Sequence, residues 1–340
     1  NDFSHLKVVD SIFFGGGTAS LLSTKHIHNL INFFGQHFSF SKNCEITLEG
    51  NPENINLEYL KDLEAIGVNR INVGIQTFAA ELLTSMNRYF DLNSYNHILD
   101  LLSMSSIRSR GVDLMYGLPG QTEQQFFNDL QRVVKANLEH LSIYSLIQEP
   151  NTMYSKLVQN GLRKPPNENL QNQLFQKLPS KLSSYGFQIY EVSNYSKPDF
   201  ECRHNLRYWL YEPYMGLGPG AHGFDGRLRY GNLRNIQRWQ KNTTGATKEP
   251  HKPEIDVPLN LFRIARPFQP KWFADILNQE VTSQVLPFFE QQEQLGYGNF
   301  LDENLSSNQT SSSHIWFQWN LHGLTFLDSI IESFVNQNAK

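Results

Sequence analysis

Short apolar segments alternate with longer amphipathic segments along the first half of the chain. The apolar segments are typical of buried β-strands and lie at 11–14, 45–48, 70–75, 111–115 and 140–147. The amphipathic segments carry apolar residues at helical spacing and lie at 26–38, 57–66, 93–104 and 123–136. Because parallel strands need helical crossovers between them, this alternation predicts an α/β fold with a parallel sheet, either doubly wound or curled into a barrel.

The second half of the chain is organised differently. A last helix-to-strand passage is predicted at 185–195. Residues 242–257 are polar and contain proline, which favours a linker, and residues 258–340 combine helical patterns with a polar insert. We therefore expect a first domain over 1–241, a linker over 242–257 and a small, mainly helical C-terminal domain over 258–340.

Composition and charge give no support for a nucleic-acid-binding or membrane-spanning protein. The 340 residues have a net charge of −4 and no block of Lys or Arg, so nothing favours binding to nucleic acid. No apolar run is long enough to span a bilayer, and no signal peptide is visible. The two cysteines, Cys44 and Cys202, cannot form a disulfide framework, which favours a cytoplasmic protein. The chain starts at Asn1, close to its first predicted strand, and we expect a natural N-terminal segment to precede it.

Polar residues follow most of the predicted strands. Gly15–Thr18, Glu49, Gln76 and Asp113 each stand at or near the end of one strand. Since ligands bind at the C-terminal ends of strands in both parallel architectures, these residues predict one shared pocket.

The first two of these segments each allow two interpretations. The glycines of Gly15–Thr18 leave backbone groups bare for the approach of a ligand, but a tight turn capped by Thr18 or Ser20 is the simpler alternative. The segment is not a Walker loop, because no lysine follows at the required spacing. Glu49 can accept hydrogen bonds from an ammonium group or a ribose hydroxyl, or it can cap the next helix.

The next two segments contain side chains suited to a polar ligand. Gln76 can bind a hydroxyl group, and Arg88 can hold a carboxylate with its planar guanidinium. Asp113 stands inside an apolar strand, where an unpaired carboxylate is costly. It therefore needs a partner, either a structural arginine or a bound ligand.

Together these segments resemble a known family. Gly-Gly-Gly-Thr, Glu-Gly-Asn-Pro, Gly-Ile-Gln-Thr-Phe, Asn-Arg and Asp-Leu-Met-Tyr-Gly-Leu-Pro-Gly-Gln-Thr occur at 15–18, 49–52, 74–78, 87–88 and 113–122. In this order they resemble the core of the oxygen-independent coproporphyrinogen III oxidase family of radical S-adenosylmethionine proteins. The resemblance implies a partial (β/α)6 barrel, here missing its first strand. It also implies contacts to S-adenosylmethionine from Gly16, Gly17, Thr18, Glu49, Gln76, Arg88 and Asp113, with Ile147 near the adenine.

One departure from this family concerns its metal cluster. Members hold a 4Fe-4S cluster on three cysteines of a CxxxCxxC loop, because such clusters need thiolate ligands. Cys44 and Cys202 stand 158 positions apart, and no such loop occurs in the sequence. We therefore expect this chain, as given, to lack radical chemistry. Its first strand would lie at an open edge of the sheet, and such an edge favours association into a homodimer.

The segment Cys202–Trp209 indicates a branch of the family. His204, Asn205, Tyr208 and Trp209 have the spacing HNxxYW, which resembles the HemW-like branch of heme chaperones. The resemblance implies heme and heme-acceptor proteins as partners. His204 is then the expected ligand of the heme iron, Cys202 an alternative ligand, and Tyr208 or Trp209 a ring that packs on the macrocycle. The simpler alternative is that His204 and Asn205 are structural hydrogen-bonding residues and Trp209 fills the core.

Three functions are compatible with these observations. The first is a heme chaperone, which binds heme and transfers it to acceptor proteins. The second is an oxygen-independent coproporphyrinogen III oxidase of porphyrin biosynthesis. The third is an inactive truncated copy. The HNxxYW spacing favours the first.

Overall fold

A computed structural model describes residues 8–88, 92–241, 247–250, 252–301 and 315–338, and these group into two compact units. The barrel unit consists of the described residues of 7–189 and 193–201. The C-terminal unit consists of those of 190–192 and 202–340. The two units are described separately below.

The barrel unit follows the predicted alternation of strands and helices. Its elements are β1 (Val8–Phe14), α1 (Thr24–His37), β2 (Ser39–Gly50), α2 (Leu57–Ala65), β3 (Arg70–Gln76), α3 (Ala80–Ser85), α4 (Leu92–Met104), β4 (Ser109–Tyr116), α5 (Glu123–Lys135), β5 (His140–Ser145), α6 (Met153–Gln159), α7 (Glu168–Ser183), β6 (Gln188–Glu191) and β7 (Asn194–Ser196). Short 3-10 turns, η1 (Ala19–Leu21) and η2 (Pro52–Asn54), follow β1 and β2.

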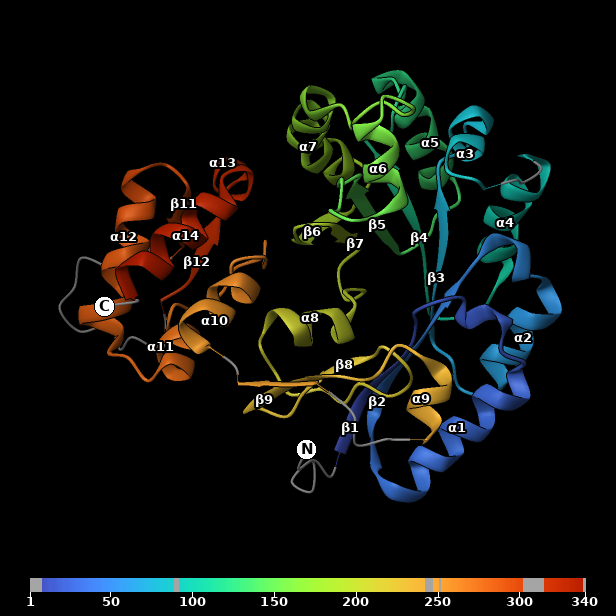
Figure 1. Cartoon of the computed structure of the whole chain (residues 1–340), viewed down its shortest axis with the longest axis horizontal. Helices are drawn as coiled ribbons and strands as arrows, with labels where there is room; N and C mark the ends of the chain where they lie inside the picture. The colour runs from blue at the N-terminus through green and yellow to red at the C-terminus, as the bar shows by residue number, and fades with distance from the viewer. Residues whose placement is uncertain (1–7, 89–91, 242–246, 251, 302–314, 339–340) are drawn as a thin grey trace. The chain divides into compact units, whose positions relative to one another are not determined.

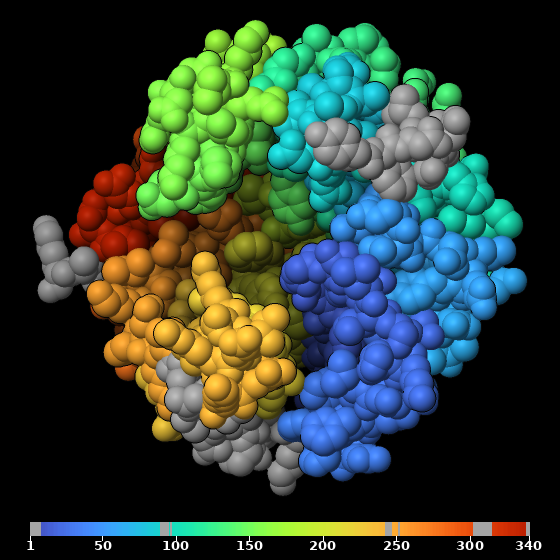
Figure 2. Space-filling model, turned by 45° about the vertical axis from the view of Figure 1, so that its right-hand side comes forward, coloured from blue at the N-terminus to red at the C-terminus, as the bar shows by residue number. Residues whose placement is uncertain are grey.

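One curled sheet organises this unit. Its strand order is β1-β2-β3-β4-β5-β7-β6, and β1 to β5 pair in parallel with their neighbours. The helices α1 to α5 lie on the outer face of the sheet (Figure 1), and in Figure 2 the outer segments follow one another from blue through cyan to green. The predicted α/β partial barrel is therefore confirmed. The predicted parallel sheet is wrong at its end, because β7, which lies at the end of the passage predicted at 185–195, pairs antiparallel with β5.

Side-chain caps determine where several helices begin. The Ser23 side chain accepts a hydrogen bond from the His26 N–H at the start of α1, and Asn56 accepts one from Tyr59 at the start of α2. Helix α5 starts with a capping box between Thr122 and Gln125. The cap of α1 is thus Ser23, and neither Thr18 nor Ser20 has that role.

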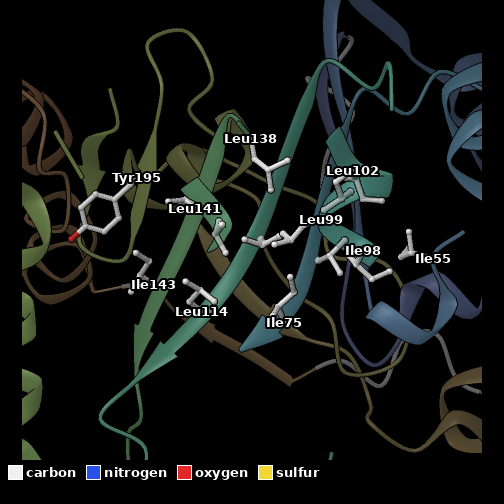
Figure 3. Close-up of a cluster of buried hydrophobic side chains, with 14 of the residues drawn as sticks. Ile55, Ile75, Ile98, Leu99, Leu102, Leu114, Leu138, Leu141, Ile143 and Tyr195 are labelled. Carbon is white, nitrogen blue, oxygen red and sulfur yellow. The ribbon is translucent and has the colours of Figure 1, made fainter. Parts of the chain in front are cut away.

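The core of the barrel unit lies between the sheet and its helices (Figure 3). Ile98 and Leu102 of α4 point toward the strands, where Ile75, Leu114 and Leu141 are buried. Burial of an aliphatic side chain of this size contributes about 1.5–3 kcal/mol. This packing fixes the strands and therefore the positions of the polar residues at their C-terminal ends.

The C-terminal unit is mainly helical, and it includes residues 202–241, which we expected in the first domain, in addition to the range 258–340. It contains α8 (Arg203–Trp209), α9 (Ile236–Lys241), α10 (Pro253–Leu261), α11 (Lys271–Leu277), a π-helical turn η3 (Val281–Val285), α12 (Leu286–Gln294), α13 (Leu321–Thr325) and α14 (Leu327–Asn338). Its strands are β8 (His222–Phe224), β9 (Leu228–Gly231), β10 (Thr247–Pro250), β11 (Gly298–Phe300) and β12 (Phe317–Trp319). A cluster of aromatic rings around Phe262, Phe273 and Phe289 fills its core.

The range predicted as a linker contains regular structure. Within 242–257, β10 pairs antiparallel with β9, and α10 begins at Pro253. The polar insert that starts near Ser306 lies outside the described residues. None of the described helices is both long and apolar enough to cross a membrane.

Candidate functional site

The glycine loop after β1 and the end of β2 are joined at Glu49. The Gly16 N–H donates a hydrogen bond to Glu49 Oε2 over 3.2 Å. Gly16 and Gly17 have φ values of 77° and 56°, a left-handed conformation that favours glycine, and a Cβ atom at either would meet nothing within 4 Å. The loop therefore presents open backbone next to a carboxylate, and Glu49 does not cap the following helix.

The end of β3 departs from regular strand geometry. The register between β3 and β4 shifts between Gly74 and Gln76, and Gln76 has a φ of 70°. Left-handed conformations are costly for residues with a side chain and are concentrated at functional sites. A Cβ at Gly74 would lie 2.9 Å from Gln76 Nε2 and 3.9 Å from Asp113 Oδ2, so the absent side chain lets both polar groups lie close to the Gly74 backbone.

Arg88 is held at the same end of the sheet. Its Nη1 donates a hydrogen bond to the Gly74 carbonyl oxygen over 2.8 Å. Burial raises the pKa of both Tyr95 and Asp113, and the positive charge of Arg88 opposes each rise; the Arg88 side chain also hydrogen-bonds Tyr95. Arg88 and Asp113 therefore lie near each other at this end of the sheet, and their lining of one shared pocket stays a prediction.

Asp113 has partners that the sequence analysis did not identify. Asn72 on β3 donates a hydrogen bond to Asp113 Oδ1, and Ser142, opposite Asp113 in the register of β4 and β5, donates another. Both are polar residues inside apolar strand segments, which is the signal that could have revealed them. The hydrogen-bonding partners of Asp113 are thus an amide and a hydroxyl group, whereas we predicted an arginine or a bound ligand; Arg88 acts on Asp113 through its charge.

The charges of this site favour a cation. Burial raises the pKa of Asp113 to about 6, hydrogen bonds from Ser142 and Asn72 oppose this rise, and the Glu49 charge adds to it. Burial of its carboxyl group also raises the pKa of Glu49, although the residue as a whole is exposed, and the Gly16 N–H opposes that rise. Two carboxylates and one guanidinium leave one net negative charge when all three groups are ionised.

S-adenosylmethionine fits this set of donors and acceptors. Its ammonium and sulfonium groups exceed its single carboxylate by one positive charge, which complements the site. Its amino acid end can reach the open backbone at Gly16 and Gly17, and Gln76 and Arg88 offer donors for its hydroxyl and carboxylate groups. These residues would hold the ligand.

Two residues of the predicted set lie at the margin. Thr18 precedes the turn η1 without a capping hydrogen bond from its side chain, and its backbone oxygen accepts from Leu21. Ile147 lies two residues after β5 with 66% of its surface exposed. Ser20 joins the loop to the next one, because its hydroxyl group bonds both Asn51 and Asn54.

The residues described do not fit a 4Fe-4S cluster. Among them no group of three His, Cys, Asp or Glu side chains is placed to hold a metal ion. Cys44 and Cys202 are both buried and belong to different units. We therefore assign no chemical step to a cluster in this chain.

A second polar and aromatic group lies in the C-terminal unit, on α8. His204 Nε2 and Tyr208 Oη are 2.8 Å apart, and the two rings meet edge to face. The Tyr208 ring contacts Tyr214 with 4.5 Å between the ring centroids. Cys202 precedes the helix and is 3% exposed. The Arg263 guanidinium covers the Trp209 ring at 5.6 Å from its centroid.

Comparison with known proteins gives concordant matches. The model of the radical SAM superfamily matches residues 3–133. The heme chaperone HemW of Haemophilus influenzae is 32% identical over 96% of this chain and 83% of its own length. HemW of Escherichia coli is 37% identical over 65% of this chain and 58% of its own. The structure of Escherichia coli coproporphyrinogen III oxidase, HemN, superimposes with a TM-score of 0.75 at 20% identity, covering 96% of this chain and 78% of that one.

Proposed function

Because the chain belongs to the HemW family of the radical SAM superfamily, we propose that it is a heme chaperone, which binds heme and transfers it to acceptor proteins. The observation that carries this proposal is the identity to heme chaperones over nearly the whole chain, α8 included. The likeness to the coproporphyrinogen III oxidase supports a shared fold and no shared reaction.

The group of side chains on α8 supports heme binding in the C-terminal unit. An imidazole and a phenol, both known heme ligands, stand one helical turn apart with a further aromatic ring beside them. Such rings can pack on a porphyrin. His204, Tyr208 and Trp209 are the residues that we propose for this role, with Cys202 as the alternative iron ligand.

We further propose that the barrel unit binds S-adenosylmethionine. Glu49, Gln76, Arg88 and Asp113 would hold its charged and hydroxyl groups above the backbone of Gly16 and Gly17, with Thr18 and Ile147 at the margin of the site. When bound to an iron–sulfur cluster, S-adenosylmethionine supplies radical chemistry; the residues named here would hold it as a ligand. The affinity of the described residues by themselves should be low, because no group of them could hold an iron ion that chelates the amino acid end.

Hemin titration tests the main proposal. The purified chain is titrated with hemin, and a shift of the Soret band that saturates near one equivalent supports the proposal. A signal that rises without saturation indicates non-specific association and contradicts it. The loaded chain is then mixed with apomyoglobin as a reporter acceptor. Faster appearance of holomyoglobin than from hemin bound to serum albumin supports chaperone activity.

A further inference from the structure

The hydrogen bond within α8 distinguishes between its two candidate iron ligands. Resting on the proposed heme binding, we propose that Tyr208 ligates the iron of bound ferric heme through its phenolate oxygen. His204 is then a positioning residue, which holds that oxygen and takes up its proton.

The two side chains form a preformed pair. His204 and Tyr208 are four residues apart on α8, so they lie on the same face of the helix. Their polar atoms are 2.8 Å apart, and the ring planes are inclined by 86°. The nitrogen engaged is Nε2, the ring nitrogen farther from the backbone and a common site for metal binding.

The hydrogen bond between His204 Nε2 and Tyr208 Oη affects the capacity of these two atoms to bind iron in different ways. An imidazole nitrogen has one in-plane position, occupied by either a proton or a lone pair, so a bond to Tyr208 and a bond to iron exclude each other at Nε2. A phenol oxygen can accept a hydrogen bond and bind a metal at the same time. With the pair intact, Tyr208 can bind iron, whereas His204 can do so through Nε2 only after the pair separates.

The surroundings keep the Tyr208 ring in place. Its ring meets Tyr214 edge to face, with the planes inclined by 78°. Tyr214 is itself fixed by two backbone hydrogen bonds with Phe224, of 2.8 and 2.9 Å. The phenol is therefore positioned before heme arrives.

The neighbouring candidates are less suitable as ligands. Cys202 is 3% exposed, so its thiol would have to leave the interior to reach a heme. Trp209 is not a ligand for iron; because the Arg263 guanidinium covers one face of its ring, the other face is the one that can pack on a porphyrin.

The chemistry of the bond balances without a redox step. Ferric iron accepts the phenolate oxygen, an Fe–O bond forms, and the water or hydroxide ligand of hemin leaves. The phenol proton passes to His204 Nε2. The resulting imidazolium then donates its N–H to the bound phenolate, which stabilises the charged oxygen.

Spectroscopy of hemin-loaded variants tests this assignment. Resonance Raman and absorption spectra of the parent protein should show a phenolate-to-iron charge-transfer transition and tyrosinate ring modes. Tyr208→Phe keeps the ring and its contact with Tyr214 but should lose these signals and bind hemin roughly tenfold more weakly or worse, equivalent to about 1.4 kcal/mol. Tyr214→Phe is the matched control and should keep them.

The His204 variants separate positioning from ligation. His204→Ala should keep the tyrosinate signals but show them only at higher pH, and His204→Gln, which can still donate a hydrogen bond, should restore part of that shift. A parent spectrum without tyrosinate signals, or signals that survive Tyr208→Phe in a protein folded by circular dichroism, would overturn the assignment while heme binding stands. Failure of the folded parent to bind hemin would remove the proposed function together with this inference.

Discussion

Asn72 on β3 donates a hydrogen bond from its side-chain amide to the carboxylate of Asp113 on the adjacent strand β4. Ser142 on β5 supplies a second donor to the same carboxylate. Three neighbouring strands thus contribute to one polar cluster at the candidate site for S-adenosylmethionine. The cluster compensates only part of the desolvation of Asp113, because burial still raises its pKa to about 6.

The raised pKa of Asp113 predicts a pH dependence of ligand binding. The carboxylate is mostly charged above about pH 6 and mostly neutral below it, so the affinity for S-adenosylmethionine should rise between about pH 5 and pH 7. Calorimetry at high ligand concentration over this range measures the effect. Asp113→Asn should bind weakly at every pH in this range, without the rise.

The raised pKa of Asp113 also predicts how the stability of the protein depends on pH. Because the folded-state pKa is raised from 3.8 to about 6, the folded state holds the proton more tightly, and the free energy of unfolding falls as pH rises through this window. Asp113→Asn should therefore be more stable than the parent at pH 7, by at most about 3 kcal/mol, and equally stable near pH 3. Asp129→Asn is the control: burial raises the pKa of Asp129 too, but its partner is Thr77, so ligand binding should not change.

Gly16 gives a test of the open backbone after β1. Gly16→Ala introduces a side chain in the left-handed region without a steric contact, which should cost about 1–2 kcal/mol of stability. Gly67→Ala is matched to it, because Gly67 also has a positive φ of 94° and open space around it, in the turn between α2 and β3. Urea denaturation should show similar losses for both, whereas only Gly16→Ala should weaken the binding of S-adenosylmethionine. Equal binding by both variants would contradict the placement of the ligand at Gly16.

The sequence predicted the barrel unit well because its strands are apolar and its helices amphipathic. Predicted helices at 57–66 and 123–136 correspond to α2 and α5 within a residue at each end. Periodicity carries no information on strand direction, so the antiparallel β7 could not be predicted. Strand β10 was assigned to a linker because all four of its residues are exposed, which leaves no apolar pattern to recognise.

The candidate site was predicted only in part, because the sequence pattern shows each strand by itself and not how the strands pair. Glu49, Gln76 and Asp113 end or interrupt apolar segments, and such positions are visible in the sequence. Asn72 and Ser142 take part only because parallel pairing brings their strands next to β4, and that register is a three-dimensional property. The pairing of His204 with Tyr208 was hidden in a similar way: helical spacing places the two residues on one face, but does not show that Nε2 is already engaged.

The backbone of Gln76 is strained, and we expect this strain to hold its side chain in position for the ligand. Its left-handed backbone at the β3 bulge should make Gln76→Gly more stable than Gln76→Ala by about 1 kcal/mol, since glycine adopts this conformation freely. Both variants lack the side-chain amide and should bind S-adenosylmethionine more weakly than the parent. Thermal denaturation and calorimetry measure the two effects. Asn137→Gly, at another left-handed position, in the turn after α5, should leave binding unchanged.

The last prediction concerns the opposite end of the sheet, where Arg70 begins β3. Its Nε lies 3.1 Å from Glu45 Oε2, and its Nη2 donates to the carbonyl oxygens of Phe200 and Glu201 over 2.7 and 2.9 Å. Both charged side chains are 6% exposed. Arg70→Met leaves a buried carboxylate and two carbonyl groups without these donors, so it should cost about 3–5 kcal/mol.

The chain provides both a control and a way to assign this loss to the barrel unit. The Lys177–Glu123 pair is 51% and 38% exposed, and Lys177→Ala should cost at most about 1 kcal/mol.

All five tryptophans lie at position 209 or beyond, within the C-terminal unit, so tryptophan fluorescence follows that unit while far-ultraviolet circular dichroism follows both. Arg70→Met should therefore move the circular dichroism transition to lower urea and leave the fluorescence transition in place. Adding Glu45→Gln should recover part of the loss, since the uncompensated charge is then gone. A loss below 1 kcal/mol for Arg70→Met would mean that the pair does not stabilise this end of the sheet.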